Sequence, residues 1–401
     1  MSFLSLIPAL VCVLIALAVC EVLQRKFGAP DSDSRNLPID GLRGYLAFFV
    51  FLHHAYIWQV YIKTGVWTYP ASRIFMHFGP TSVAVFFMIT GYLFTSKILD
   101  ARARQINWTR LFVGRIARLM PMYVVAGLLL FAATAVVSRG GALALRPAEH
   151  AKNIIEWMTF GRLGIRGANV SVDGVDFSHF LASVTWSLPY EWFFYFSLPV
   201  FALVLGDRPK FLPVALGCAG LFALYRIDPT LGHQIYFLAG AGSCLLVRHK
   251  WFTFLARTRL ASLAILLLIS ATVAFHATPW GLTTAPVLLG SAFCLVAGGN
   301  SLFGALTATA PRLLGEISYS MYLLHGAMLW ILFNYLVGMR VASALPATLY
   351  WAVVVLLTPI LVIICYGTFR AIEAPAIAYG RTVGGALSGL VVMRHGVRRE
   401  A

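Results

Sequence analysis

Charged residues are scarce in this sequence. Asp, Glu, Lys and Arg make up only 11% of its 401 residues, whereas about 25% is usual for a soluble domain. Acidic residues are the scarcest, because 15 Asp and Glu stand against 31 Lys and Arg. Hydrophobic residues make up 60% of the chain and fall in long runs, and the mean hydropathy is +0.81. The composition therefore predicts an all-α, multi-pass membrane protein.

Other absences narrow the class further. The alternating segments of about ten residues that mark a membrane β-barrel are missing. The six cysteines lie in apolar runs without a CxxC motif or a Cys/His spacing, so we expect no metal site and cysteines that pack as small hydrophobic residues. The net charge of +16 is spread between hydrophobic runs. It is not gathered on a soluble module, so we do not expect nucleic-acid binding.

Apolar stretches long enough to be candidate membrane spans occur along the whole chain. The eleven candidates cover residues 3–22, 41–61, 80–98, 119–137, 186–205, 211–226, 232–247, 260–276, 282–298, 315–336 and 345–369. The first lacks a basic segment before it and is followed by Arg25 and Lys26, so we interpret it as a retained helix and not as a signal peptide. The sixth and seventh are short, and a tilted or re-entrant course would change the count.

Basic residues set the orientation of these spans. Cytoplasmic loops carry an excess of Lys and Arg, and most of the 31 basic residues fall on one side when the N-terminus is placed outside. The C-terminus is then cytoplasmic. The longest outer segment covers residues 138–185 and is polar and rich in glycine. A loop of this length is usually functional or disordered.

One apolar span carries two ionisable residues on the same face. Arg43 and His54 are eleven residues apart, and eleven helical residues turn about 1,100°, which is three turns plus about 20°. The two side chains then lie about 16 Å apart along the axis, with Arg43 near the inner surface and His54 near mid-depth. Ionisable groups are costly in a bilayer, so both are functional candidates. Alternatively, His54 could satisfy a backbone carbonyl in a packed bundle, and His53 is expected to be an ordinary interior or interfacial histidine.

Two more ionisable residues are expected at similar depth. His325 in the tenth span reaches mid-depth, and Glu191 in the fifth lies about one and a half turns below the outer surface. Because buried charges need partners, we expect both imidazoles and the carboxylate to converge in the outer half of the bundle. A structural role is the alternative for each: His325 packed in the core, and Glu191 capping or pairing near the interface.

Arginines cluster before the fourth span. Arg115 and Arg118 are three residues apart and share a helix face, with Arg110 nearby. Guanidinium groups bind phosphate in bidentate fashion, so we predict phosphate recognition on the cytoplasmic side. Membrane topology alone, or contact with anionic lipids, is the alternative. In the third span, Thr90 and Gly91 lie at mid-depth, where simple packing and hydrogen bonding are both open.

Five short strings together resemble the membrane acyltransferase family 3, whose members transfer acyl groups to bacterial saccharides. Each string is weak alone, but all five occur in the family's order across about residues 37–375. The strings are Asp40-Gly41-Leu42-Arg43-Gly44 with His54; Phe86-Phe87 with Thr90-Gly91-Tyr92-Leu93-Phe94; Arg115 and Arg118-Leu119 with Pro121 and Tyr123; Trp186-Ser187-Leu188 with Glu191; and Ser318-Tyr319-Ser320 with Tyr322-Leu323 and His325.

The resemblance implies a fold, a reaction and roles for four residues. It implies ten core helices, a cytoplasmic acyl-CoA donor, usually acetyl-CoA, and a saccharide or glycolipid acceptor reached at the outer face of the inner membrane. It also implies that Arg43 and His54 are essential and that Arg115 and Arg118 bind CoA. Thr90 departs from the serine that is common at its position in the family.

The resemblance also divides the chain. Residues 1–36 would form an extra N-terminal transmembrane helix and linker, residues 37–375 the acyltransferase domain, and residues 376–401 a basic cytoplasmic tail. The acceptor would be handled by the bundle, by residues 138–185 or by a separate polysaccharide-biosynthesis protein. The expected partners are thus acyl-CoA, the acceptor and the lipid bilayer.

These residues predict an acyl-transfer mechanism. A neutral imidazole can take the proton of a hydroxyl that attacks a thioester, and we assign this role to His54. A donor must stabilise the oxyanion, for which His325 and Thr90 are candidates. Glu191 would orient a histidine or, with Trp186 and Thr90, bind the acceptor. A covalent acyl-enzyme stays open.

Two other functions stay open at this point. Intramembrane histidines and a glutamate also suit a proton relay in a transporter of a saccharide or lipid intermediate, although we find no inverted repeat of the kind many transporters carry. A structural subunit of a polysaccharide export complex is the second alternative, and it would not need Arg43 or His54.

Overall fold

The computed structural model of the protein describes residues 6–28, 36–101, 106–137, 171–172, 175–176, 179–205, 211–227 and 232–397. The regular secondary structure of this part of the chain is helical apart from one antiparallel pair of two-residue strands, β1 (Ser171–Val172) and β2 (Val175–Asp176). The all-α prediction is therefore confirmed. The remainder of the predicted outer loop 138–185, up to residue 178, lies outside the described residues.

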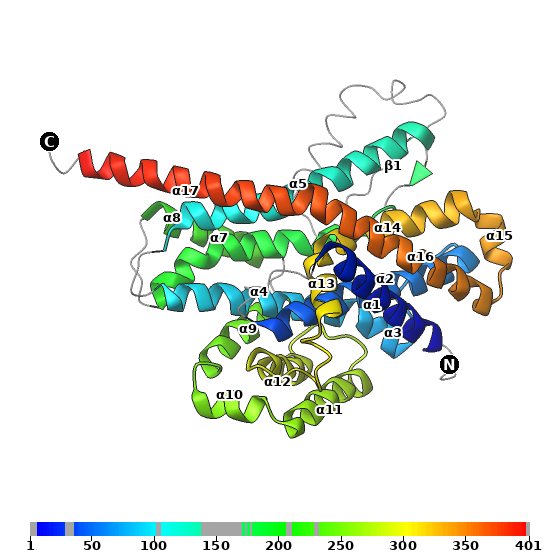
Figure 1. The fold of residues 1–401 in the computed structure, drawn as a ribbon, viewed down its shortest axis with the longest axis horizontal. Coiled ribbons are helices and arrows are strands. Elements are labelled where there is room, and N and C mark those ends of the chain that lie inside the picture. The colour runs from blue at the N-terminus through cyan, green and yellow to red at the C-terminus, as the bar shows by residue number, and fades with distance from the viewer. Residues whose placement is uncertain are drawn as a thin grey trace.

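Helices make up most of the described residues, from the N-terminal to the C-terminal end (Figure 1). They are α1 (Ile7–Phe27), α2 (Leu37–Thr64), α3 (Arg73–Phe78), α4 (Pro80–Asp100), α5 (Trp108–Val137), η2 (Val184–Ser187), α7 (Leu188–Val204), α8 (Phe211–Ile227), α9 (Gln234–Leu246), α10 (Lys250–Ala256), α11 (Arg259–Phe275), α12 (Ala285–Ala297), α13 (Thr309–Glu316), α14 (Ser318–Ile331), η3 (Leu332–Leu336), α15 (Met339–Ala344), α16 (Ala347–Thr368), η4 (Phe369–Glu373) and α17 (Ala374–Val397). Each of the predicted spans falls on one or more of these helices.

Within the described residues, five helical stretches are long and apolar enough to cross a membrane, or six if the bent pair α10 and α11 forms one span. Helices α9 and α12 are apolar but shorter. The number of spans and the orientation with the N-terminus outside therefore stay predictions. Helices α3, α10, α13 and α15 were not predicted, because each is a short helix of six to eight residues.

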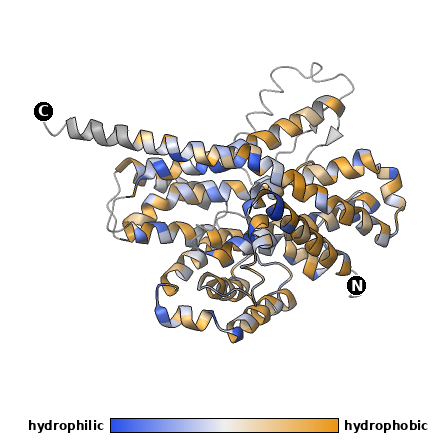
Figure 2. Ribbon diagram, in the orientation of Figure 1, coloured by the Kyte–Doolittle hydropathy of each residue, from blue (hydrophilic) through white to orange (hydrophobic). Residues whose placement is uncertain are grey.

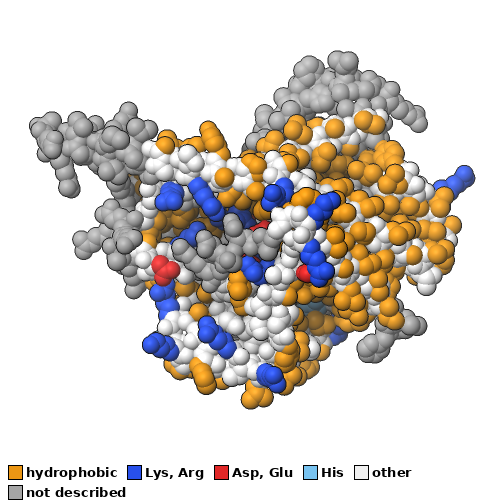
Figure 3. Space-filling model, in the orientation of Figure 1, with side chains coloured by type: hydrophobic (Ala, Val, Ile, Leu, Met, Phe, Trp, Pro, Cys, Tyr) orange, Lys and Arg blue, Asp and Glu red, His pale blue; other side chains and the backbone are white. Residues whose placement is uncertain are grey.

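Large hydrophobic side chains cover much of the outer surface. Phe275 on α11 is 80% exposed, and Leu356 on α16 is 70% exposed. Soluble monomers rarely expose apolar patches of more than a few hundred Å². Figure 2 shows hydrophobic residues along α11, α15 and α16. In Figure 3 hydrophobic side chains cover most of the region of α15 and α16, whereas most of the visible Lys and Arg side chains lie towards the middle and left. The protein is therefore a multi-pass membrane protein.

Glycines bring the start of α2 against α13. A Cβ added to Gly44 would lie 2.4 Å from the carbonyl oxygen of Pro311, and one added to Gly315 would lie 2.0 Å from that of Asp40. Gly41 meets the backbone of Leu306 in the same way. The two glycines of the Asp40–Gly44 string thus form the packing face of α2, which explains their spacing around Arg43.

A second close contact joins α4 to α9. A Cβ on Gly91 would lie 2.0 Å from the carbonyl oxygen of Phe237, and one on Gly240 would lie 1.9 Å from that of Met88. Glycine permits such approach of two helix backbones. The packing role considered for Gly91 is therefore confirmed.

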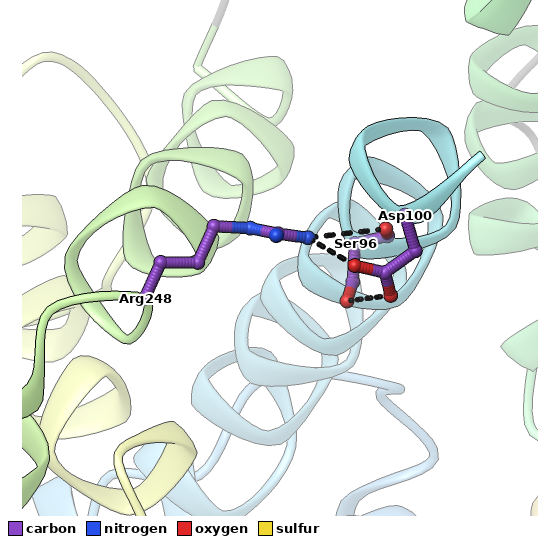
Figure 4. Close-up of polar contacts among 3 residues, drawn as sticks. All are labelled: Ser96, Asp100 and Arg248. Atoms are coloured by element: carbon purple, nitrogen blue, oxygen red, sulfur yellow. Dashed lines mark hydrogen bonds and ion pairs between the residues drawn. The ribbon is translucent and has the colours of Figure 1, made fainter. Parts of the chain in front are cut away.

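A polar contact joins the end of α4 to the segment after α9 (Figure 4). Arg248 Nη2 donates to Asp100 Oδ1 at 2.5 Å and to the carbonyl oxygen of Ser96 at 3.5 Å, and Ser96 Oγ donates to Asp100 Oδ2 at 3.3 Å. The hydrogen bond with Asp100 raises the pKa of the Arg248 guanidinium. Both charged side chains are about half exposed, so the pair contributes no more than about 1 kcal/mol.

The last helices form one continuous rod. Helix α16 passes through the π-helical turn η4 directly into α17, which lies along α5 in Figure 1. Gly380 of α17 meets Ala117 of α5, and Gly384 meets Arg110. The segment predicted as a basic tail therefore begins as a helix packed on the arginine-bearing helix α5.

Candidate active site

Two histidines from different helices meet in the interior. His54 on α2 and His325 on α14 lie with His54 Nδ1 and His325 Nε2 3.1 Å apart, and His325 is fully buried. The predicted convergence of the two imidazoles is confirmed. His53, one residue before, is 3% exposed, and its Nδ1 contacts the carbonyl oxygen of Phe75 at 2.7 Å.

Backbone carbonyls fix the protonation of the histidine pair. A ring nitrogen that faces a carbonyl oxygen must carry the proton, because the carbonyl can only accept. His325 Nδ1 therefore donates to Met321 O at 2.8 Å, and its Nε2 is an acceptor in the neutral ring. His54 Nδ1 faces both Val50 O at 3.0 Å and His325 Nε2 at 3.1 Å, so it carries a proton that both acceptors share. The unprotonated nitrogen of His54 is then Nε2.

His54 lines a cavity of about 760 Å³ whose walls include three tryptophans, Trp67, Trp186 and Trp280. The rings of Trp186 and Trp280 meet edge to face at 5.8 Å between centroids, and Trp67 lies 6.5 Å from the ring of His54. None of the described residues that line this cavity is Asp, Glu, Lys or Arg. We call it the imidazole cavity, and its volume falls in the usual range for small-molecule sites, about 300–1,000 Å³.

A second cavity, of about 140 Å³, lies beside the start of α2. Its polar lining includes three arginines, Arg43, Arg115 and Arg118, together with Glu191 and Thr90. We call it the arginine cavity. Arg43 donates to Ser318 Oγ at 3.3 Å, and the Arg115 guanidinium lies 5.2 Å from the centre of the Phe94 ring. The three predicted arginines are thus brought together from α2 and α5.

Glu191 lies in the arginine cavity and not beside the histidines. It accepts hydrogen bonds from Thr90 Oγ1 at 3.4 Å and from the Tyr195 hydroxyl at 3.2 Å. The expected convergence of this carboxylate with the two imidazoles is therefore wrong. The reason is that Phe180 and Val184, which precede α7, are themselves buried, so α7 begins deep inside the molecule and its first turn cannot be counted from the surface.

A carboxylate that the sequence did not single out completes the charge cluster. Glu373, at the end of η4, is 1% exposed. It accepts a hydrogen bond from Ser320 Oγ, which itself accepts one from Thr368 Oγ1 at 2.9 Å, and its charge interacts with those of Arg118 and Arg43. Its position near the end of the last apolar run was the one available signal.

Helix α2 links the two cavities. It carries Arg43 into the arginine cavity and His54 into the imidazole cavity, about 16 Å apart along its axis by helix geometry. The sites on α2, α5 and α14 are buried and polar inside an apolar bundle. Such groups in a membrane protein mark functional sites by default.

Fold and site together define a multi-pass helical membrane protein with a buried polar centre. The chain belongs to acyltransferase family 3, because the family described as an acyltransferase domain matches residues 36–370. The protein is therefore a membrane acyltransferase, and α1 lies before the matched region. Neither a curated protein nor a solved structure matches the chain.

Proposed function

We propose that the protein transfers an acyl group, first of all acetyl, from cytoplasmic acyl-CoA to a hydroxyl group of a saccharide or glycolipid at the outer face of a bacterial inner membrane. The observation that carries the proposal is the pair of cavities along α2, with a cationic cavity at Arg43 and an uncharged cavity at His54. Family membership supports acyl transfer over the transporter and structural-subunit alternatives.

The arginine cavity would receive the donor. Arg43, Arg115 and Arg118 carry three positive charges on one cavity wall, and acyl-CoA is an anion with phosphate groups that guanidinium binds well. Glu191 and Glu373 interact electrostatically with these arginines and offset part of this charge.

The imidazole cavity would receive the acceptor. Sugar rings present C–H groups that pack on aromatic faces, and Trp67, Trp186 and Trp280 supply such faces around His54. The lack of charged side chains in its described lining favours an acceptor moiety without charge. We therefore keep Trp186 in acceptor binding, and because Glu191 and Thr90 line the arginine cavity we propose both on the donor side.

The bond-making step follows from the protonation of His54. The acceptor hydroxyl oxygen attacks the thioester carbonyl carbon while its proton moves to His54 Nε2. The C–S bond then breaks and CoA leaves as a thiolate. His54 passes the proton that it took from the hydroxyl to this thiolate, which gives the free CoA thiol. His325 Nε2 accepts a hydrogen bond from His54 Nδ1–H throughout and stabilises the imidazolium, while its own N–H donates to Met321, so His325 acts as a positioning residue with no N–H left for the oxyanion.

The test uses purified full-length protein in lipid nanodiscs with acetyl-CoA and cell-envelope glycan from which acyl esters have been removed by base. Free CoA thiol should appear only when both substrates are present, with one new glycan ester per thiol. CoA release at the same rate with and without glycan would contradict the proposal. So would the absence of CoA release by properly folded protein.

A further inference from the structure

The two cavities meet at two side chains. Among the described residues, only Val83 of α4 and Tyr322 of α14 line both the arginine cavity and the imidazole cavity. An acyl group that starts beside the arginines must therefore pass these two side chains to reach His54. Both side chains are buried, because Tyr322 is 8% exposed and Val83 is 5% exposed.

Hydrogen bonds hold Tyr322 across this contact. Its hydroxyl donates to the carbonyl oxygen of Val184 at 2.8 Å and lies 2.8 Å from Ser187 Oγ, which is then the donor to it. Val184 lines the imidazole cavity and Ser187 lines the arginine cavity. The Tyr322 hydroxyl therefore forms hydrogen bonds with one lining residue of each cavity.

The segment that Tyr322 holds has a strained backbone. Ala182 and Ser183 have φ of 51° and 57°, the left-handed region that residues with a Cβ adopt only when their surroundings enforce it. Gly326 provides part of that enforcement, because a Cβ there would lie 2.5 Å from the carbonyl carbon of Leu181. Strain of this kind concentrates in segments that have a second conformation.

We infer that Tyr322, Val83 and the segment Leu181–Ser187 form a partition that keeps water of the imidazole cavity away from the donor thioester. The inference rests on the proposed function, because it assigns the donor and acceptor to the two cavities. In the closed state the Tyr322 hydroxyl holds Val184. Breaking that hydrogen bond lets the segment move and the acyl group pass towards His54.

The partition predicts a side reaction when it is weakened. Water would then attack the thioester carbonyl, the C–S bond would break, and acetate and CoA would form without an acceptor. Acetyl-CoA alone is therefore the probe. Tyr322→Phe keeps the ring and removes the hydroxyl, and it should raise acceptor-independent CoA release about tenfold. Val83→Phe narrows the passage and should abolish transfer to glycan while acetyl-CoA binding persists.

Tyr350→Phe is the matched control. Tyr350 also donates from a buried hydroxyl to a backbone carbonyl, that of Ala55 at 2.6 Å, but it lines neither cavity. Its variant should release CoA at the wild-type rate. Equal release by the wild type and Tyr322→Phe, with equal acetyl-CoA binding, would overturn the partition and leave the proposed function standing. A wild-type protein that binds no acetyl-CoA would overturn both.

Discussion

Neighbouring histidines on α2 have different surroundings. His53 is closed in by the backbone of Phe75 and by Gly79, where a Cβ would lie 2.5 Å from its ring. His54 uses Nδ1 for Val50 and His325 and keeps Nε2 unprotonated in a cavity wall. A general base needs a free lone pair within reach of the proton it takes. Both rings line this cavity, but of the two only His54 has a second imidazole, that of His325, against its Nδ1 to stabilise the ring once it takes the proton.

Replacement of His54 should remove the base and leave donor binding intact. We expect His54→Gln to lower kcat for acyl transfer by about 10² to 10⁴-fold, with little change in the Kd of acetyl-CoA. His276→Gln is the control, because His276 bonds Thr284 and lines neither cavity. Kinetics of CoA release in nanodiscs provide the measurement. Normal turnover by folded His54→Gln protein would refute the assignment.

The arginines should act on donor affinity and not on the chemical step. Arg115→Lys keeps the charge but loses the planar fork, and loss of a charged hydrogen bond is worth about 1.5–3 kcal/mol. We therefore expect KM for acetyl-CoA to rise about 10- to 100-fold at similar kcat. Arg110→Lys serves as control, because this exposed arginine lies on the same helix outside both cavities. An unchanged KM for Arg115→Lys would show that it does not bind the donor.

At the scale of elements, glycines decide how closely helices approach. Gly91→Ala would place a methyl group 2.0 Å from a backbone carbonyl oxygen of α9, and overpacking of this kind usually costs about 1–3 kcal/mol. Gly114→Ala makes the same change on α5, where nothing lies within 4 Å, and should be neutral or stabilising. Thermal unfolding in detergent compares the two. Equal melting temperatures would mean that α4 and α9 separate easily.

The positions of the long helices could be predicted because apolar runs are readable from composition alone. The short helices α3, α10, α13 and α15 could not, since six to eight residues carry little periodic signal. The arginine cluster and the histidine pair followed from spacing and from the strings shared with the family. The position of Glu191 could not be predicted from spacing, because this position depends on the buried segment before α7. The position of the Glu373 side chain depends on the π-helical turn η4, and no sequence pattern predicts that turn.

At the scale of the whole molecule, the proposed reaction requires a defined orientation. The arginine cavity must open towards cytoplasmic CoA and the imidazole cavity towards the outer face. Tyr69, after α2, is 66% exposed and lines the imidazole cavity, whereas Trp251 on α10 is 62% exposed. The basic-residue pattern predicts that Tyr69 is outside and Trp251 inside.

Single cysteines test this orientation in intact cells. In a background where the exposed Cys218 is replaced by serine, a membrane-impermeant maleimide should label Tyr69→Cys and spare Trp251→Cys until the cells are opened. The reverse pattern would invert the topology and with it the assignment of the donor cavity.

Acyl groups should reach an envelope saccharide only through His54. Mass spectrometry of envelope glycans from cells that carry the wild-type protein, His54→Gln or neither tests it most directly. We expect acetyl or other acyl esters on the glycan with the wild type alone, at equal protein levels in the membrane. Glycans that carry the same esters in all three strains, or in the His54→Gln strain as in the wild type, would contradict it.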